Sequence, residues 1–260
     1  MPLILSDLHL GLSPLEINGL DPVLDMADEL WLNGDTVETR HPRYRDRGER
    51  LWSELQRTCE RRGLPIRRLT GNHDHDEGLP THLELAAGRI LVTHGHAFLP
   101  SIAPWSVWAR EAERRHQACL ASLPPSERGT LRAAMQAAAC ASEAAWSDPS
   151  RERRLHAAAM LTRPWAIAAV LRTWMRWPAL AHAFTHRHRP EARLLVSGHA
   201  HRRGVHRRNG LVIMDTGSFN PPARAAAVRV RDHEACWIPL TLRRGRHEPA
   251  AESRWIRVSV

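Results

Sequence analysis

The stretch Leu3-Ile4-Leu5-Ser6-Asp7-Leu8-His9 joins a short apolar run to a polar cluster, and this pattern recurs four more times along the chain. Runs of this length predict strands that are buried on both faces of a sheet. The other runs are Leu30-Trp31-Leu32, Ile66 to Leu69, Ile90-Leu91-Val92 and Leu194-Leu195-Val196. The polar clusters that follow them are Gly34-Asp35, Gly71-Asn72-His73-Asp74, His94-Gly95-His96 and Gly198-His199-Ala200-His201.

The polar clusters are expected to meet at one edge of the sheet. In open α/β sheets, ligands bind beyond the carboxyl ends of the strands, where loops vary while strands hold their positions. Asp7 and His9 are two residues apart, as are His199 and His201, and residues at that spacing face the same side of extended backbone. Each pair is therefore predicted to aim at a shared target.

The residue types in the clusters predict a catalytic metal site. Carboxylates, imidazoles and an amide carbonyl are ligands that suit manganese, iron or zinc. None of the clusters contains Cys, which argues against a sulfur-rich structural zinc site.

The five clusters in this order resemble the motifs of the calcineurin-like metallophosphoesterase superfamily. The motifs Asp-x-His, Gly-Asp-x-x-Glu, Gly-Asn-His-Asp, His-Gly-His and Gly-His-x-His extend from Asp7 to His201. The resemblance implies two divalent metal ions, with manganese expected and iron or zinc as alternatives. One ion would be held by Asp7, His9, Asp35 and His201, and the other by Asp35, Asn72, His94 and His199. A pair of ions bridged in this way clamps a phosphoryl oxygen and generates hydroxide from water.

Four further residues are predicted to act on the substrate or on a metal ligand. The resemblance implies that His73 contacts the phosphate or protonates the leaving group, and Asp74 is expected to orient or charge-stabilise its imidazole. Glu38 is predicted to accept a hydrogen bond from a metal-bound histidine. His96 has two interpretations, a substrate contact and a loop histidine with only local hydrogen bonds.

Composition bounds the class of protein. With 260 residues and a mass of 29.5 kDa, the chain is predicted to form one domain, residues 1–260, with a helical insertion at 100–190. Met1-Pro2 leads directly into the first apolar run, and no stretch of about 18 uncharged apolar residues occurs, so a cytoplasmic protein is expected. The four cysteines lack Cys-x-x-Cys spacing and are expected to be reduced core residues: Cys59, Cys119, Cys140 and Cys236.

The formal net charge of +9 has two interpretations. Clustered cations favour nucleic-acid binding, because they neutralise phosphates and release counterions. All 37 basic residues are Arg, however, which indicates a coding bias that replaced Lys throughout the chain. Arg202 and Arg203 directly follow the last metal motif and are predicted to contact an anionic phosphorylated substrate, since Arg forks match phosphate geometry.

The segment between His94 and His199 is rich in Ala and helical in character. Helices are predicted near 103–122, 126–146, 150–161 and 164–176, with Ser126 and Ser150 as N-caps. His182, His186 and His188 are predicted to lie in a basic loop that returns to the strand at 193–196. The insertion is expected to lie over the metal edge.

An apolar surface is predicted near the end of the insertion, interrupted by Arg172 and Arg176. One interpretation is core packing of the insertion against the main domain. The other is a lid or groove for an acyl chain, or a surface that rests on a membrane, because aromatic residues with Arg suit an apolar–water boundary. The residues of this surface are Trp165, Ile167, Ala168, Val170, Leu171, Trp174, Met175 and Trp177.

Strands are also predicted after the last motif, at 211–214, 225–230, 235–242 and 254–258, as expected for the second sheet of the superfamily. The predicted fold class is therefore α/β. It is a metallophosphoesterase-type sandwich of two mixed sheets flanked by helices, with a helical insertion capping the active site.

Metal-dependent hydrolysis of a phosphoester or pyrophosphate bond is the leading functional hypothesis. Asp-Leu-His-Leu-Gly, Gly-Asp-x-x-Glu and the helical insertion are most similar to the branch of the superfamily typified by UDP-2,3-diacylglucosamine pyrophosphatase. That resemblance implies a nucleotide-lipid substrate and peripheral contact with the inner membrane. The alternatives are a phosphodiesterase or nuclease that acts on nucleotides or nucleic acid, and a metal-stabilised scaffold without activity.

Overall fold

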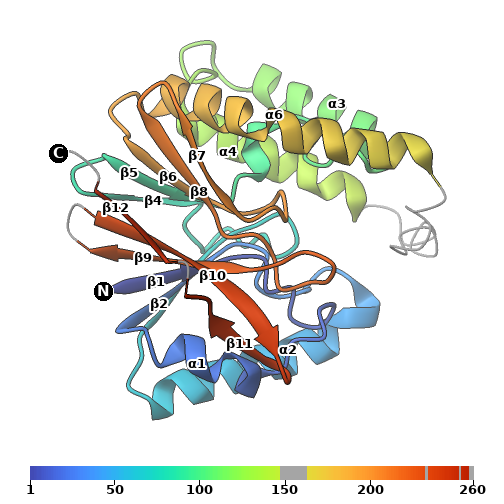
Figure 1. Cartoon of the computed structure of the whole chain (residues 1–260). Coiled ribbons are helices and arrows are strands. Elements are labelled where there is room, and N and C mark those ends of the chain that lie inside the picture. The colour runs from blue at the N-terminus through green and yellow to red at the C-terminus, as the bar shows by residue number, and fades with distance from the viewer. Residues whose placement is uncertain (147–162, 232–233, 252, 258–260) are drawn as a thin grey trace. The chain divides into compact units, whose positions relative to one another are not determined.

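A computed structural model describes residues 1–146, 163–231, 234–251 and 253–257 of the chain. The chain divides into two compact units, of which unit 1 comprises Met1–Gly95 with Arg189–Val260 and unit 2 comprises His96–His188. Unit 1 holds the strands of two sheets, and unit 2 is helical (Figure 1). The helix predicted near 150–161 lies outside the described residues.

The first sheet has seven strands among the described residues, in the order β11-β10-β9-β1-β2-β3, with β12 paired to β10. β1, β2 and β3 run parallel, whereas β9 pairs antiparallel with β1 and the later strands continue antiparallel from it. The strands are β1 Pro2–Leu5, β2 Glu29–Asn33, β3 Ile66–Leu69, β9 Ala226–Arg231, β10 Glu234–Arg243, β11 Arg246–Pro249 and β12 Arg254–Arg257.

The second sheet has five strands in the order β4-β5-β6-β8-β7. β5, β6 and β8 run parallel, and β4 and β7 are antiparallel edges. Both sheets are thus mixed, which confirms the predicted α/β fold with two mixed sheets. The predicted capping of the active site by the insertion stays a prediction. The strands are β4 His82–Leu85, β5 Ile90–Thr93, β6 Leu194–Ser197, β7 Gly204–Arg208 and β8 Leu211–Asp215.

The expectation that the strands after the last motif form the second sheet is wrong for most of them. Of these strands, only β8 belongs to that sheet, whereas β9, β10 and β12 extend the first sheet. The reason is the antiparallel pairing of β9 with β1, in which Leu3 lies opposite Arg229 and Ile4 opposite Val228. Sheet membership depends on this long-range pairing, which the local pattern of apolar residues does not encode.

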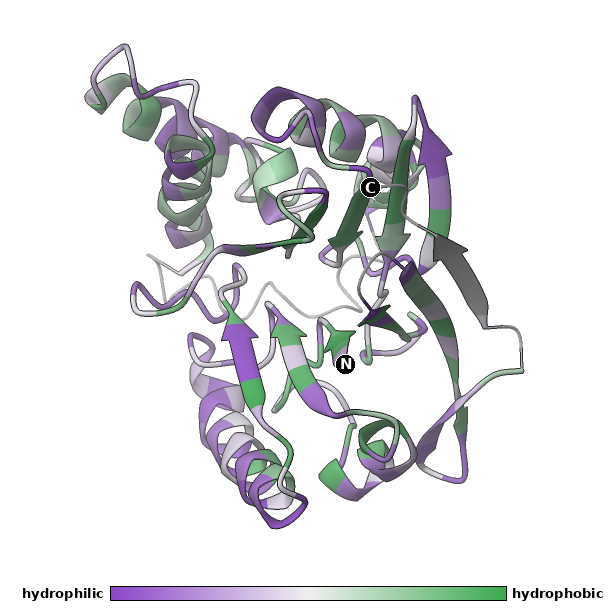
Figure 2. Cartoon of the chain, turned by 90° about the vertical axis from the view of Figure 1, so that its left-hand side faces the viewer, coloured by the Kyte–Doolittle hydropathy of each residue, from purple (hydrophilic) through white to green (hydrophobic). Residues whose placement is uncertain are grey.

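A buried apolar layer joins the two sheets. Successive side chains of a strand point to opposite faces, and in β1 Ile4 faces this layer while Leu3 and Leu5 face the other side. Ile4 lies there beside its cross-strand partners Trp31 and Val228, with Val92 and Val196 contributed by the second sheet. The inner strands of both sheets are accordingly mostly hydrophobic in Figure 2.

Two helices and a short 3-10 helix cover the outer face of the first sheet. They are η1 Ile17–Leu20, α1 Asp21–Leu24 and α2 Pro42–Arg61. α2 begins with a proline at its first position, where the missing N–H breaks no intrahelical bond. Leu51, Leu55 and Cys59 recur every four residues, so they form one face that packs into the same cluster as Leu3 and Leu5.

The prediction that all five apolar runs are buried on both faces is wrong for β3. Arg67 is exposed and Ile66 only half-buried, because β3 is an edge strand of the first sheet. None of the predicted apolar runs covers the short edge strands β4, β7 and β11. All three carry polar residues in edge positions, where burial and hence apolar patterning are weak.

Unit 2 contains 3-10 and α-helices among the described residues: η2 His96–Phe98, α3 Ala109–Ser122, α4 Leu131–Ser142, η3 Glu143–Ala145 and α6 Pro164–His188. α3 begins six residues later than predicted. The N-cap of α4 is Thr130, which accepts a hydrogen bond from the main-chain N–H of Ala133, and not the predicted Ser126. Ser150 lies outside the described residues.

The predicted basic loop at 182–189 is wrong, because α6 continues through Pro178 to His188. A proline inside a helix removes one hydrogen bond and ordinarily ends or kinks the helix. Here packing holds the helix on both sides of the proline, since Trp177 before it and Phe184 beyond it lie 5.1 and 4.9 Å from Phe98 between ring centroids. Tertiary packing therefore overrides the local stop signal.

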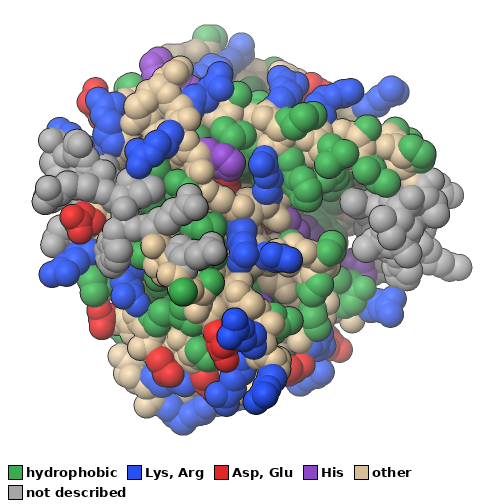
Figure 3. Space-filling view, in the orientation of Figure 1, with side chains coloured by type: hydrophobic (Ala, Val, Ile, Leu, Met, Phe, Trp, Pro, Cys, Tyr) green, Lys and Arg blue, Asp and Glu red, His purple; other side chains and the backbone are tan. Residues whose placement is uncertain are grey.

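The apolar surface predicted near residues 165–177 is divided between the interior and the exterior of unit 2. Trp177 is buried, whereas Trp165 and Leu171 are 50% exposed and Met175 is 75% exposed. Figure 3 shows hydrophobic side chains along α6 in the upper right of the view. Core packing consequently accounts for only part of this surface. Among the described residues, no helix is long and apolar enough to cross a bilayer.

Replacing Ile4 with Ala is expected to lower the free energy of unfolding by about 2–5 kcal/mol, because it opens a cavity in the layer between the sheets. Ile167→Ala is the matched control: this side chain is 40% exposed on α6, and the expected loss is below about 1 kcal/mol. Urea denaturation followed by circular dichroism measures both. Equal losses in the two variants would contradict the described core.

Candidate metal centre

The loops after β1 and β2 run side by side and carry the first predicted ligands. The main-chain N–H of Asp7 donates to the carbonyl of Gly34 (3.1 Å), and that of His9 donates to the carbonyl of Asp35 (3.0 Å). These bonds continue the parallel pairing of the two strands beyond the sheet edge. The loop after β6 joins them, because the N–H of His199 donates to the carboxylate of Asp7 at 3.1–3.2 Å.

Five of the predicted ligands adopt the left-handed backbone conformation, which L-residues other than Asn and Asp rarely adopt. Their φ angles are +52° at Asp7, +46° at His9, +49° at Asp35, +65° at His199 and +51° at His201. The prediction that the i, i+2 pairs converge along extended backbone is therefore wrong. They converge because left-handed residues turn the chain at the strand ends, and strain of this kind concentrates at functional sites.

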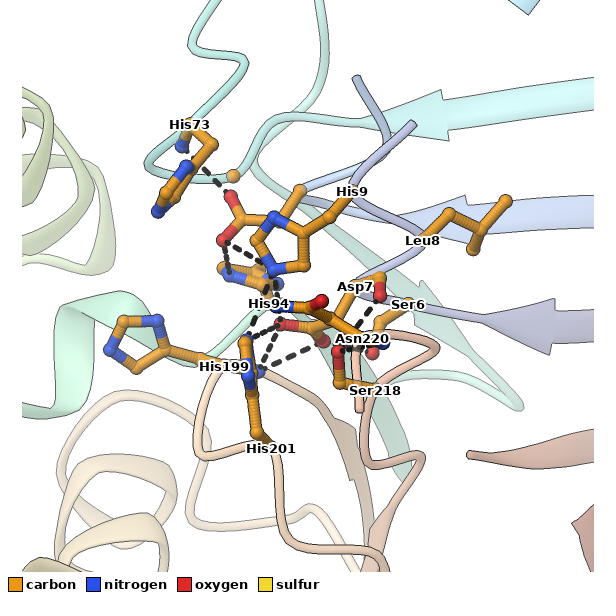
Figure 4. A network of polar contacts seen from close by, with 12 residues as sticks. Ser6, Asp7, Leu8, His9, His73, His94, His199, His201, Ser218 and Asn220 are labelled. Atoms are coloured by element: carbon orange, nitrogen blue, oxygen red, sulfur yellow. Dashed lines mark hydrogen bonds and ion pairs between the residues drawn. The ribbon is translucent and has the colours of Figure 1, made fainter. Parts of the chain in front are cut away.

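One ligand group comprises Asp7, His9 and His201. Nε2 of His201 lies 3.0 Å from Nε2 of His9 and 3.2 Å from Oδ1 of Asp7. Figure 4 shows these side chains gathered at one point, while Leu8 points away from them. Two ligand atoms at about 2.1 Å from one ion, about 90–110° apart, are separated by about 3.0–3.4 Å. The spacing therefore fits a shared metal ion.

A second ligand group comprises Asp35, His94 and His199. Nε2 of His94 lies 3.2 Å from Oδ2 of Asp35, and the ring of His94 lies 5.3 Å from that of His199 between centroids. Nδ1 of His94 is 3.0 Å from the carbonyl of Asn33, to which it donates, so Nε2 is the ligand atom of the neutral ring. Oδ2 of Asp35 also lies 3.9 Å from Nε2 of His9, which puts this carboxylate between the two groups.

Asn72 supplies an independent indication of a cation. Its Oδ1 atom is buried and, within the described part of the chain, has no hydrogen-bond partner. A buried carbonyl oxygen left unpaired costs about 1–3 kcal/mol, so native proteins seldom leave one without a partner. A metal ion would give this oxygen atom the partner that it lacks, which fits the role of metal ligand predicted for Asn72.

His73 and Glu38 form a pair beside the ligands. Nδ1 of His73 lies 2.9 Å from Oε2 of Glu38, and Nδ1 of His9 lies 2.6 Å from Oε1 of the same carboxylate. Partial burial favours the neutral ring of His73, but the carboxylates of Glu38 and Asp35 outweigh it and raise its pKa to about 10. Burial would raise the pKa of Glu38, yet the imidazoles of His73 and His9 lower it to about 2. Glu38 thus links a predicted ligand to the predicted catalytic histidine.

The orienting contact predicted between Asp74 and His73 is made by Glu38 instead. The carboxylate of Asp74 accepts hydrogen bonds from the main-chain N–H groups of Gly71 (2.9 Å), Asp35 (3.0 Å) and Thr36 (2.8 Å). Asp74 thereby holds the loop after β2 against the loop after β3. Its effect on the imidazole of His73 is only a small electrostatic stabilisation of the charged ring.

Buried negative charge is the main electrostatic property of the centre. Burial alone would raise the pKa of Asp35, but the imidazoles of His94 and His73 hold it well below its usual range. His94 and His201 likewise lower the pKa of Asp7. Both carboxylates are therefore ionised at neutral pH, although each is at most 1% exposed. Buried carboxylates that face imidazoles are a suitable environment for divalent cations.

Two glycines of the motifs are required by close approach. A Cβ atom at Gly71 would lie 2.2 Å from Oδ1 of Asp35, and one at Gly198 would lie 2.2 Å from Oδ2 of Asp7. Contacts this short do not occur between real side chains, so any larger residue would displace a carboxylate of the centre. The Gly-Asn-His-Asp and Gly-His-x-His motifs therefore begin with glycine for a packing reason.

The remaining predicted site residues are Arg202, Arg203 and His96. Nη1 of Arg203 donates to the carbonyls of Ala225 (2.8 Å) and Leu240 (2.5 Å), and Arg202 is exposed. His96 is buried in η2 at the start of unit 2. Substrate contacts of these three residues stay predictions.

Two serines that hold Asp7 have no role in the sequence-based prediction. The hydroxyl of Ser6 donates to Oδ2 of Asp7, and the hydroxyl of Ser218 donates to the carbonyl of Asp7 (3.1 Å). Ser6 precedes Asp7 in the first cluster, and Ser218 lies in the polar turn after β8. The available signals were the position of Ser6 next to Asp7 and the polar character of the turn at 215–220, but a hydroxyl in a turn has many other uses.

No protein-family model matches the chain, and no curated protein matches it. Solved structures that align with it include Vps29 from Chaetomium thermophilum, at 12% identity over 100% of this chain and 97% of that chain with a TM-score of 0.47. A dimetal phosphatase from Danio rerio aligns at 11% identity over 99% of both chains with a TM-score of 0.45. The phosphoesterase Yfce from E. coli aligns at 12% identity over 99% and 100%, with a TM-score of 0.42. At these values the likenesses carry no weight for function.

Metal binding is expected to weaken as the pH falls. Burial favours the neutral ring of His94, but the carboxylates of Asp35 and Asp7 outweigh it and raise its pKa to about 9. The charged ring of His94 carries a proton on Nε2, and an ion can bind there only after this proton has left. The apparent affinity for Mn²⁺ should therefore rise between about pH 6 and about pH 8. The slope should approach about tenfold per pH unit for each displaced proton. Calorimetry in two buffers of different ionisation enthalpy measures affinity and proton release together.

The matched variants for this measurement are His94→Gln and His82→Gln. The first should release one proton fewer, because its ring is gone. The second alters a histidine of the edge strand β4 and should release as many protons as the wild type. An affinity that is independent of pH would rule out His94 as a ligand.

Proposed function

We propose that this chain is a metal-dependent hydrolase of phosphoester or pyrophosphate bonds. The observation that carries the proposal is the position of Asp35, which belongs to two overlapping groups of potential ligands, one with His9 and His73 and the other with His94 and His199. A single carboxylate between two sets of imidazoles is the arrangement that a pair of divalent ions requires. Asp7, His9 and His201 would hold one ion, and His94, His199 and Asn72 the other.

The chemistry that a pair of divalent ions supplies in such a site is polarisation of the phosphoryl oxygens and activation of water. The protein's own contribution is to fix the ligand atoms. Nδ1 of His9 is held by Glu38 and Nδ1 of His94 by the carbonyl of Asn33, so Nε2 of each ring is directed to the centre. Phosphorus is then attacked by water while the bond to the leaving oxygen breaks.

His73 is the residue placed to give a proton to the leaving oxygen. Its side chain is 28% exposed, compared with 34% for His201 and with the buried rings of His9 and His94, so a substrate can reach it from solvent. Nδ1 donates to Glu38, and Nε2 is the nitrogen that transfers the proton. Glu38 also stabilises the charged ring before the transfer.

For the substrate, we propose a nucleotide-lipid pyrophosphate. The resemblance of the first two motifs and of the inserted helical segment to UDP-2,3-diacylglucosamine pyrophosphatase supports this choice. The exposed apolar side chains of α6, among them Leu171 and Met175, give unit 2 a surface that suits an acyl chain. Mass spectrometry of products from UDP-diacylglucosamine, free nucleotides and single-stranded DNA distinguishes this substrate from the nuclease alternative.

Hydrolysis of bis(p-nitrophenyl) phosphate and p-nitrophenyl phosphate with added Mn²⁺ tests the reaction class. The wild type is expected to release p-nitrophenolate from at least one of them. Asp35→Ala should lose both ions and all turnover, because its carboxylate lies between the two groups. Asp46→Ala, at an exposed position of α2, should keep wild-type activity. If two ions bind per wild-type chain and neither these substrates nor UDP-diacylglucosamine turns over, the chain is a metal-stabilised scaffold.

His73→Gln is expected to lower turnover by about 10²–10⁴-fold while leaving the metal content unchanged, because the ring donates a proton without holding an ion. Glu38→Gln should lower turnover and also weaken metal binding by about 10–100-fold, since it holds the rings of His73 and His9 together. Steady-state kinetics and metal analysis separate the two effects. Wild-type turnover in His73→Gln would remove His73 from the mechanism.

A further inference from the structure

Two cysteines of unit 2 face each other across a pair of helices. Cys119 lies on α3 and Cys140 on α4, and their Sγ atoms are 2.8 Å apart. Both side chains are partly exposed. The expectation of four core cysteines therefore holds for Cys59 and Cys236, which are buried in unit 1, and is wrong for this pair.

The helices around the pair hold the two sulfur atoms together. The two cysteines are 21 residues apart in sequence. They are brought together because α3, which ends at Ser122, and α4, which begins at Leu131, are neighbouring helices joined by a short loop. On α4, Ala137 and Ala141 flank Cys140 and are buried, which indicates a closely packed helix surface. Small residues of this kind allow helix backbones to approach within the reach of short side chains such as Cys.

The separation of the sulfur atoms is close to that needed for a covalent bond. A disulfide has an S–S length of about 2.05 Å, and it forms only where the Cβ atoms already face each other. Neither thiol is enclosed in apolar core, so a small oxidant can reach the pair from solvent. An isolated buried cysteine is inert, because it has neither a second sulfur atom nearby nor access to solvent. Cys119 and Cys140 have both.

We propose that Cys119 and Cys140 form a reversible disulfide that links α3 to α4 when the protein meets a small-molecule disulfide. This proposal does not depend on the metal centre or on the proposed hydrolysis. It assigns unit 2 a modification site whose state follows the thiol–disulfide balance of the surroundings.

The reaction proceeds by two thiol–disulfide exchanges. One protein thiolate attacks a small-molecule disulfide, forms a mixed disulfide and releases one thiolate of the oxidant. The second protein thiol loses its proton and attacks the protein sulfur of the mixed disulfide, which releases the other half of the oxidant. In total two protein thiols are oxidised, one small-molecule disulfide is reduced to two thiols, and the protons pass to the released thiolates.

Oxidation is expected to be slow at neutral pH and faster at higher pH. Burial and the neighbouring Cys140 thiol raise the pKa of Cys119 to about 12. The attacking thiolate of Cys119 is therefore rare near neutral pH, and exchange rates follow the fraction of thiolate.

Oxidised glutathione followed by alkylation of the remaining thiols, trypsin digestion and mass spectrometry tests the proposal on the wild-type chain. Cleavage after Arg115, Arg128, Arg132 and Arg151 places the two cysteines on separate peptides, 116–128 and 133–151. The expected product is these two peptides joined by a disulfide and separated again by dithiothreitol. Glutathione found separately on Cys119 and Cys140, or both cysteines alkylated after oxidation, would overturn the proposal.

Thermal unfolding gives a second measurement that needs no digestion. A disulfide that closes a loop of this size should raise the melting temperature of the helical unit by an amount on the order of 5 °C. Oxidised wild type should show this shift, whereas Cys119→Ser and Cys140→Ser, treated in the same way, should not. Cys236→Ala keeps the pair and should still shift. A shift that persists in both serine variants would show that another group is responsible.

Discussion

The carboxylate of Asp35 is ionised inside the protein, and the rest of the centre is arranged around that charge. The N–H of His73 donates to its Oδ1 (2.9 Å), and Nε2 of His94 lies 3.2 Å from its Oδ2. Removing an uncompensated carboxylate from water costs several kcal/mol even after relaxation. Each neighbouring loop must therefore deliver a donor or a cation. Gly71 lacks a side chain for a steric reason, since a Cβ there would lie 2.2 Å from Oδ1 of this carboxylate.

The sheets of unit 1 hold the loops of the centre in a strained backbone conformation. Residues such as His9 and His199 in left-handed backbone cost about 1–3 kcal/mol each. They keep that conformation because the strands before them are anchored in buried apolar layers and because Asp74 ties three main-chain N–H groups together. The buried strands thus hold the strained loops in place. Unit 2 differs from unit 1 in that its thiol pair and the apolar face of one helix are partly exposed to solvent.

Prediction from sequence succeeded where one local pattern sufficed. Apolar runs followed by Asp, Asn or His indicated five strands and the side chains that end them, and the structure brings Asp7, Asp35, His94 and their partners together. It failed where distant residues decide the outcome. The stop signal at Pro178 is overridden by the packing of Trp177 on Phe98, and the partner of His73 is Glu38, not the adjacent Asp74. Neither contact can be predicted from the residues that adjoin it in the sequence.

The sequence by itself determined which side chains are available as metal ligands, because ligand type and order are properties of the residues and of short motifs after apolar runs. Only the tertiary structure decided how those residues meet: through left-handed backbone at Asp7 and His9, and through one glutamate that binds two imidazoles. It also decided that β9 joins β1 and that Cys119 meets Cys140. These outcomes depend on pairing and packing between segments far apart in the chain, whose free energies no local pattern contains.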